Sequence, residues 1–298
     1  MVPTAKMMPA PLSAVNGGAM DDHSFYWWSK KLEERAGIVI PASRKQFLAS
    51  NLNQRIRATR SRNEEEYYAQ VLEGPMGARE WANLIDCLTV HQTHFFRHLP
   101  SVELVRQHAR QWFVRGEGGG KREFHAWSVG CSTGEEAWTL AMILATEAAS
   151  GRKAYYSVLG TDVSQPALAL ARQAQYDQER MGEIPPEYGQ RWCVPAEGRF
   201  IIHPALQKRV AFATLNLLDH SAAPLLSNVH LIYCQNVLIY MPRRTRHQIL
   251  DRFATLLRPG GLLLLGPGEV MTWNHPGMEP VDNPRTLAFR RTDRGHSS

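Results

Sequence analysis

Residues 128–136 read Ser-Val-Gly-Cys-Ser-Thr-Gly-Glu-Glu, and this stretch decides the fold. It follows a strand-sized apolar segment at 124–129 and opens a segment whose apolar residues, from Ala137 to Leu144, recur at helical spacing. Small side chains in the turn would let a ligand approach the backbone, and glycine permits dihedral angles that other residues avoid. A strand, such a turn and a helix form one unit of a parallel sheet.

Strand and helix signals continue to alternate after this unit. Strand-sized apolar segments lie at 157–161, 229–234 and 262–265, and segments of helical spacing separate them. The pattern predicts an α/β fold with a doubly wound, mostly parallel, Rossmann-like sheet over residues 122–292.

The alternation breaks in one place. Between residues 176 and 215 the chain has Pro185-Pro186 and two short β-prone pieces, 199–202 and 210–213. They predict a small antiparallel β subdomain at about 188–213.

The first part of the chain has helical patterning only. We expect a disordered tail at 1–20, an all-helical domain at 21–115, and a glycine-rich linker at 115–121 before the α/β domain. In the helical domain, Leu48, Leu52 and Ile56 form one apolar stripe.

Basic residues flank that stripe. The segment 44–62 holds six basic and no acidic residues, and Arg55, Arg57 and Arg60 lie beside the stripe. With a net charge of +6, this segment favours an acidic partner over a plain solvated face, which charge runs often form. Aromatic residues are absent from 55–62, which argues against nucleic acid as the partner.

Composition restricts the compartment and the chemistry. The sequence has no apolar run of about 18 residues or more and no secretory leader pattern, so we expect a cytoplasmic protein without direct membrane insertion. The four cysteines are scattered and no histidine array has metal-ligand spacing, so we expect reduced thiols and no metal site.

Acidic residues mark the ends of the first two predicted strands. Glu135 and Glu136 would repel a pyrophosphate and could hold an amino group, although acids also stabilise a helix N-terminus without any ligand. Asp162 follows the second strand, where a carboxylate can accept hydrogen bonds from a ribose diol. The alternative for Asp162 is a turn or cap residue.

Six motifs, in order along the chain, resemble the CheR-type methyltransferases, which methylate glutamate side chains of chemotaxis receptors. Residues 89–97 (TVHQTHFFR) resemble the family's NxTxFFRE signature, and residues 131–136 (CSTGEE) its STGEE turn. The other matches are Asp162, residues 216–218 (NLL), residues 233–240 (YCQNVLIY, against FCRNVLIYF) and residues 266–269 (GPGE, against GHSE).

The resemblance implies S-adenosylmethionine as cofactor, with S-adenosylhomocysteine as product. It assigns cofactor binding to residues throughout the motifs: His91, Thr93, Arg97, Glu135, Glu136, Asp162, Asn216, Leu217, Asn236 and Val237. Three positions depart from the family pattern, namely His91 for Asn, His98 for Glu and Gln235 for Arg.

The resemblance also implies the reaction and the partner. Methyl transfer to an ionised carboxylate needs alignment and exclusion of water rather than a strong base. Arg97 is the candidate to orient the carboxylate, with a cofactor or structural ion pair as its alternative, and Tyr240 is a second candidate, with core packing as its alternative. Arg55, Arg57 and Arg60 would dock on the cytoplasmic helical region of a methyl-accepting chemoreceptor, with the enzyme a monomer.

Other readings remain open. One is a methyltransferase acting on a small molecule or nucleic acid, and another is a scaffold that has lost activity, which His91 and Gln235 would favour. Some CheR-type enzymes tether to a receptor peptide through their antiparallel insertion. Because the insertion is short here, we expect no tethering, and tight binding of such a peptide in calorimetry would contradict this.

Overall fold

A computed structural model describes residues 20–72, 74, 77–89, 92–115, 123–150, 155–219, 227–270 and 272–292. The tail predicted at 1–20 lies outside these residues except for Met20. The chain forms two compact units, Met1–Val90 and His91–Ser298. The predicted boundary at 115–121 differs from this division because helix α5 (Leu99–Arg115) packs on helix α6 (Glu135–Ser150) of the second unit.

The first unit is a helical bundle, as predicted. Asp21 caps its first helix by accepting a hydrogen bond from the Ser24 amide, and Gly37 ends that helix with φ of 72°. Trp28, Leu48 and Tyr67 are buried in its core. The helices are α1 (Asp22–Ala36), a 3₁₀ turn (Ala42–Arg44), α2 (Lys45–Thr59), α3 (Glu64–Leu72) and α4 (Gly77–Leu88).

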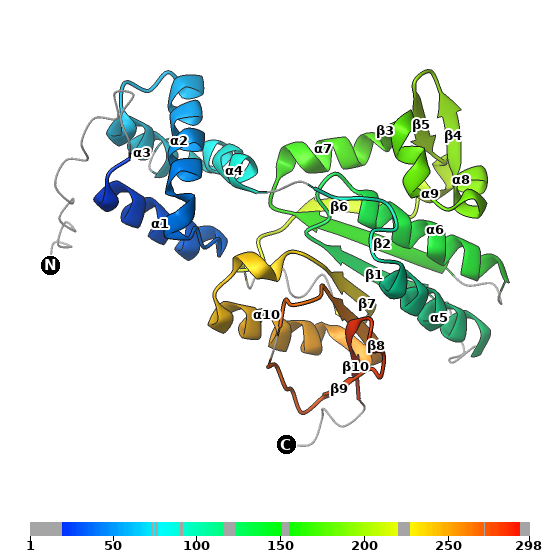
Figure 1. The fold of residues 1–298 in the computed structure, drawn as a ribbon. Coiled ribbons are helices and arrows are strands. Elements are labelled where there is room, and N and C mark those ends of the chain that lie inside the picture. The colour runs from blue at the N-terminus through cyan, green and yellow to red at the C-terminus, as the bar shows by residue number, and fades with distance from the viewer. Residues whose placement is uncertain are drawn as a thin grey trace, which may run out of the picture. The chain divides into compact units, whose positions relative to one another are not determined.

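The second unit contains the predicted parallel sheet, which is confirmed (Figure 1). Its strand order is β6-β2-β1-β7-β8-β10-β9; the first five run parallel, and β10 pairs antiparallel with β8 and β9. The strands are β1 (Glu123–Val129), β2 (Tyr155–Asp162), β6 (Val210–Thr214), β7 (Val229–Cys234), β8 (Leu257–Leu265), β9 (Met278–Pro280) and β10 (Leu287–Arg291).

Helices cover both faces of this sheet. Phe124 and Ala126 of β1 belong to one buried cluster with residues of α5 and α6. Trp127 and Val129 belong to another, with Phe253 of helix α10 (Arg243–Leu256). Because side chains alternate between the faces of a strand, the two clusters fill the two sides of the sheet.

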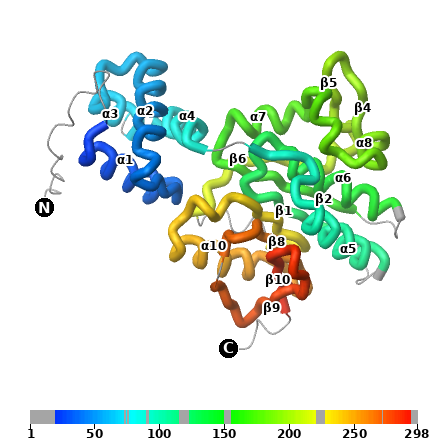
Figure 2. Tube along the Cα trace, in the orientation of Figure 1, coloured from blue at the N-terminus to red at the C-terminus, as the bar shows by residue number. Residues whose placement is uncertain are grey.

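The small antiparallel sheet exists, but its limits differ from the prediction. It has the order β3-β5-β4, from β3 (Gln175–Asp177), β4 (Cys193–Ala196) and β5 (Arg199–Ile202). The piece predicted at 210–213 instead lies in β6, which pairs parallel with β2 in the main sheet. Figure 2 shows the path of the chain from helix α7 (Gln165–Gln173) into this small sheet. Short helical segments complete it: a 3₁₀ stretch (Gln178–Glu183), α8 (Pro186–Trp192) and α9 (Pro204–Gln207).

Across the described ranges, the helices are all too short or too polar to cross a membrane.

Candidate active site

The candidate site lies where the strand order reverses. From β1 the chain proceeds outward to β2 and β6, and then returns to place β7 on the other side of β1. Ligands of open α/β folds bind outside the carboxyl ends of the strands at such a point. The loops after β1 and β7 touch there: a Cβ added to Gly130 would lie 2.4 Å from Cγ2 of Val237.

The loop after β1 holds an unusual backbone. Gly130, Ser132 and Gly134 all have positive φ, of 65°, 50° and 97°. Asp162 fixes this loop, because its Oδ2 accepts a hydrogen bond of 2.8 Å from the Ser132 amide and its Oδ1 one of 2.9 Å from the Ser164 amide. The carboxylate thereby ties the loop after β1 to the end of β2.

The two adjacent glutamates have different environments. Glu135 is fully buried; it accepts hydrogen bonds from the Thr133 hydroxyl and a close contact from Arg180. Glu136 is only partly buried and accepts a 2.6 Å hydrogen bond from the Ser128 hydroxyl. Glu135 therefore has structural partners, while Glu136 keeps surface that a ligand could contact.

The carboxylates of Glu269 and Asp162 lie close enough to Glu136 to act on its charge. Burial, with the nearby charges of Glu269 and Asp162, raises the pKa of Glu136 to about 8, although the Ser128 hydroxyl and Arg97 oppose the shift. A cationic ligand would favour the ionised form of this carboxyl. S-adenosylmethionine carries a sulfonium and an ammonium group, so these residues fit the cofactor that the sequence motifs imply.

Glu269 is a site residue that the motif comparison contained but did not single out. It is fully buried, and its Oε1 accepts the amides of Val237 at 2.7 Å and Leu238 at 2.9 Å. Its Oε2 accepts the Gly266 amide at 2.6 Å. One carboxylate therefore joins the loops after β7 and β8. Burial raises the pKa of Glu269, while the three amides oppose the shift.

Arg180 is a second such residue, and no sequence signal points to it. Besides its contact with Glu135, it donates a 2.6 Å hydrogen bond to the Thr93 carbonyl and forms an ion pair with Glu183 at 3.2 Å. Glu183 in turn accepts the Phe95 amide at 2.8 Å. This network positions the 93–97 motif beside the loop after β1.

The structure brings most of the remaining predicted residues to the same end of the sheet. Arg97 is exposed, donates to the Gln92 carbonyl at 3.0 Å and lies close enough to act on the charge of Glu136. Asn216 follows β6, and its side chain accepts the Leu218 amide at 3.0 Å. His91 lies outside the described residues.

The loop after β7 carries Asn236, Val237 and Tyr240. Asn236 has φ of 62°, a conformation that asparagine tolerates better than most residues. Tyr240 is half-buried at the end of a 3₁₀ turn, Leu238–Tyr240, so the structure does not place it in the core. Arg246 holds this loop from α10 by donating to the Met241 carbonyl at 2.7 Å and the Glu269 carbonyl at 3.0 Å. Leu217, buried after β6, offers its carbonyl to Arg252.

Two departures from the family pattern meet in space. His98 Nδ1 lies 2.7 Å from the Ser101 hydroxyl, which accepts a 2.9 Å hydrogen bond from Nε2 of buried Gln235. Burial lowers the pKa of His98, which favours a neutral ring that accepts from Ser101. A neutral chain of hydrogen bonds thus occupies the positions where the family motifs have Glu and Arg.

Replacing Gln235→Arg alone should therefore destabilise the protein by about 2 kcal/mol, because it buries a charge without a partner. The double variant H98E/Q235R should recover part of this loss by forming an ion pair. Urea unfolding of the two single variants and the double variant measures the coupling. Strictly additive effects would show that the two positions do not interact.

The predicted docking residues are not equivalent. Arg55 is engaged inside the first unit: its Nε and Nη2 donate to Glu80 at 2.8 and 2.7 Å. Tyr67 also donates to Glu80, at 3.0 Å. Arg57 and Arg60 are exposed. Arg55 is therefore a structural residue in this unit, and Arg57 and Arg60 remain the candidates for docking.

This difference gives a paired test. Arg55→Ala should lower the free energy of unfolding by about 2 kcal/mol, since it leaves the buried Glu80 carboxylate without its counter-charge. Arg57→Ala on the same helix should change it by less than about 0.5 kcal/mol. Urea denaturation of the full chain measures both. Equal, small effects would mean that the Arg55–Glu80 pair adds nothing to stability.

Comparisons with known proteins agree with this geometry. Residues 91–286 match the family described as CheR methyltransferase, SAM binding domain, and residues 23–89 match the CheR methyltransferase, all-alpha domain. The chemotaxis protein methyltransferase of Escherichia coli (strain K12) is 33% identical over 258 residues, covering 84% of this chain and 85% of that protein. Chemotaxis protein methyltransferase 1 of Pseudomonas aeruginosa is 31% identical over 245 residues, covering 80% and 87%.

A solved structure, PKMT2 from Rickettsia typhi in complex with AdoHcy, aligns more distantly. Its TM-score is 0.35 and its identity 14%, covering 58% of this chain and 26% of that one. The two family domains together span both structural units and confirm the resemblance seen in the motifs. The chain belongs to the CheR methyltransferase family and is an S-adenosylmethionine-dependent methyltransferase.

Proposed function

We propose that this enzyme transfers a methyl group from S-adenosylmethionine to glutamate side chains of a methyl-accepting chemoreceptor in the cytoplasm, forming methyl esters. The acid-lined turn at 130–136, at the point where the strand order reverses, is the observation that carries the proposal. The relatives' description as chemotaxis protein methyltransferases supports the choice of a chemosensory substrate.

The proposal gives each residue of the site a role. Glu136 attracts the cationic part of the cofactor, and Asp162 accepts the ribose hydroxyls while it holds the Ser132 amide. Glu135 acts indirectly, through Arg180, by positioning Thr93. The remaining contacts come from the loops after β6 and β7, at Asn216, Leu217, Asn236 and Val237.

The reaction asks little acid–base chemistry of the protein. When bound, the cofactor supplies an electrophilic methyl on a sulfonium. A substrate glutamate is already ionised near neutral pH, so the residues of this chain need only orient it and exclude water. Arg97 is exposed and near enough to lower the pKa of Glu136, and its guanidinium can pair with a substrate carboxylate in two parallel hydrogen bonds. Tyr240, half-buried in the neighbouring loop, would contribute a wall of the substrate site.

Recognition of the receptor is assigned to the first unit. Arg57 and Arg60 are exposed near the end of α2, with Arg62 exposed just beyond it. A basic helix surface suits the acidic methylation helices of a receptor and speeds association by electrostatic steering. We expect the enzyme to act as a monomer.

The decisive experiment combines the purified protein with radiolabelled S-adenosylmethionine and receptor-containing membranes. The expected result is label on the receptor that base releases as methanol, because carboxyl methyl esters are base-labile. The charge-reversal variant R57E/R60E should lose receptor methylation and keep cofactor affinity, and Arg191→Glu, an exposed change in the second unit, serves as control.

The other outcomes identify the alternatives. Base-stable label on nucleic acid or a small molecule would indicate a different substrate class. Cofactor binding without transfer to any of these would indicate a scaffold. Either result would overturn the proposed function without changing the family assignment.

A further inference from the structure

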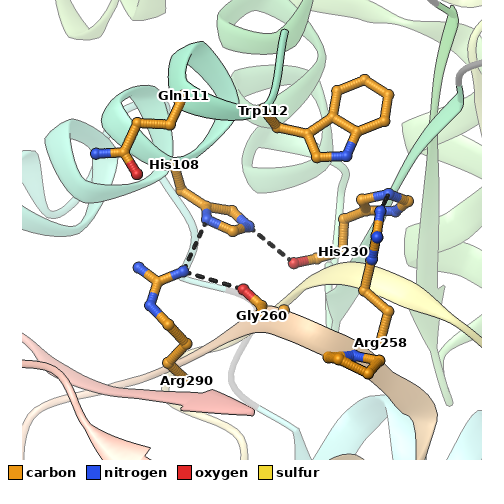
Figure 3. A pocket seen from close by; sticks show the side chains of 9 residues that line it. His108, Gln111, Trp112, His230, Arg258, Gly260 and Arg290 are labelled. Atoms are coloured by element: carbon orange, nitrogen blue, oxygen red, sulfur yellow. Dashed lines mark hydrogen bonds between the residues drawn. The ribbon is translucent and has the colours of Figure 1, made fainter. Parts of the chain in front are cut away.

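A recess of about 320 Å³ lies at the end of the strands opposite to the candidate active site (Figure 3). Its walls come from the first residues of β7 and β8, from α5 and from β10. The proposed methyl transfer uses none of these residues. They are His108, Gln111, Trp112, His230, Arg258, Pro259, Gly260, Gly261 and Arg290.

The recess is lined by positive charge. Arg258 and Arg290 approach it from β8 and β10, and the described residues that line it include no carboxylate. Arg290 donates to the Gly260 carbonyl at 3.0 Å and to Nδ1 of His108 at 3.3 Å. Nε2 of His108 donates to the His230 carbonyl at 3.1 Å. The side chain of His108 therefore has a consistent donor and acceptor arrangement.

His230 does not. Its ring is buried, with 4% exposure, and the His125 backbone amide points at Nδ1 from 3.1 Å. Nη1 of Arg258 lies 2.8 Å from Nε2 of the same ring. A neutral imidazole accepts at one nitrogen only, because the other carries hydrogen. Burial and the charge of Arg258 lower the pKa of His230 to about 3, so the ring is neutral near pH 7 and carries one hydrogen.

At one of the two ring nitrogens of His230, an N–H of the ring therefore faces another N–H donor, either the His125 amide or Arg258. The backbone amide of β1 is fixed by the sheet, whereas the guanidinium can move, so the consistent assignment places hydrogen on Nε2 of His230. Nε2–H of His230 and the N–H groups of half-buried Arg258, which both line the recess, are then available to an acceptor bound there. A buried donor without an acceptor costs free energy that a ligand oxygen would recover.

We propose that this recess binds the phosphate group of a small molecule. Phosphate oxygens would accept hydrogen bonds from Arg258 and from Nε2 of His230, with the charge of Arg290 on the facing wall. The recess is larger than one phosphate, and the Trp112 ring and Gly260 would contact the organic part of a monoester. The site is separate from the cofactor site, so binding there should leave cofactor affinity unchanged.

Calorimetry on the full-length protein tests the proposal, with inorganic phosphate and glycerol 3-phosphate as probes at constant ionic strength set by chloride. Binding of either probe is expected, and tighter binding of the ester would identify an organic phosphate as the ligand. Arg258→Gln should weaken binding about tenfold or more, because it removes a charge-assisted hydrogen bond. Arg110→Gln makes the same charge change at an exposed position of α5 and should leave binding unchanged.

A measurement on the unaltered protein covers the case in which the variant fails to fold. Phenylglyoxal modifies accessible arginines, and peptide mass spectrometry locates the adduct. Phosphate should protect Arg258 and leave Arg110 reactive. Failure of both probes to bind, equal binding by R258Q, or equal protection of both arginines would overturn the proposal.

Discussion

Replacing Gly130 by alanine should reduce affinity for S-adenosylmethionine about a hundredfold, or about 3 kcal/mol. The new Cβ would lie 2.4 Å from Cγ2 of Val237, and the backbone φ of 65° is unfavourable for a residue with a side chain. Valine is stiff at χ1, so the loops after β1 and β7 would have to separate. Calorimetry with the cofactor and with S-adenosylhomocysteine measures the loss.

Two variants make this test specific. Gly198→Ala is the matched control, because Gly198 also has φ of 65° but a Cβ there would meet no atom within 4 Å, and it should leave affinity unchanged. Val237→Ala removes the atom that clashes, so the double variant G130A/V237A should bind better than the two single losses predict. Full cofactor affinity in G130A would contradict the contact between the two loops.

Glu136→Gln should weaken S-adenosylmethionine binding by roughly tenfold to a hundredfold, since it replaces a carboxylate facing a cation with a neutral amide. It should also remove a pH dependence. The pKa of Glu136 is raised to about 8 in the cofactor-free protein, so below that pH the carboxyl must lose a proton before it can pair with the cation. Affinity of the native enzyme should therefore rise as pH increases towards 8 and then level off.

Glu135→Gln is the informative comparison. Glu135 is buried in contact with Arg180 and Thr133, and Arg180 in turn holds the Thr93 carbonyl. The E135Q variant should therefore be less stable, because the segment around Thr93 is held less firmly. It should keep the pH profile of cofactor binding. Binding titrations between about pH 6.5 and 8.5 distinguish the two glutamates. A flat profile in the native enzyme, or a flat profile in E135Q alone, would exclude Glu136 as the group that pairs with the cation.

Local sequence patterns were enough to predict the main sheet. Strands such as 229–234 are short apolar runs bounded by turns, and their periodicity does not depend on distant residues. The pairing of a short strand does depend on distant residues. The piece at 210–213 could have joined either sheet by propensity, and the open flank of β2 decided its position.

The contacts within the candidate site also depend on residues that are distant in the sequence, and local patterns do not predict them. Asp162, Glu135 and Glu136 could be named because each ends a strand or begins a helix in the expected place. The separate environments of the two glutamates depend on Arg180, which lies 45 residues away from Glu135 in the sequence. The sequence places Arg55 with the other basic residues of 44–62, because its partner, Glu80, lies 25 residues further on, in another helix.

The division of the chain at Val90 and His91 has an evolutionary consequence. All described groups proposed to hold the methyl donor follow that junction, whereas the exposed arginines proposed to select the target precede it. Gene fusion or exchange of the first unit at this junction could therefore direct the same methyltransferase domain to a different target protein without changes to its active site.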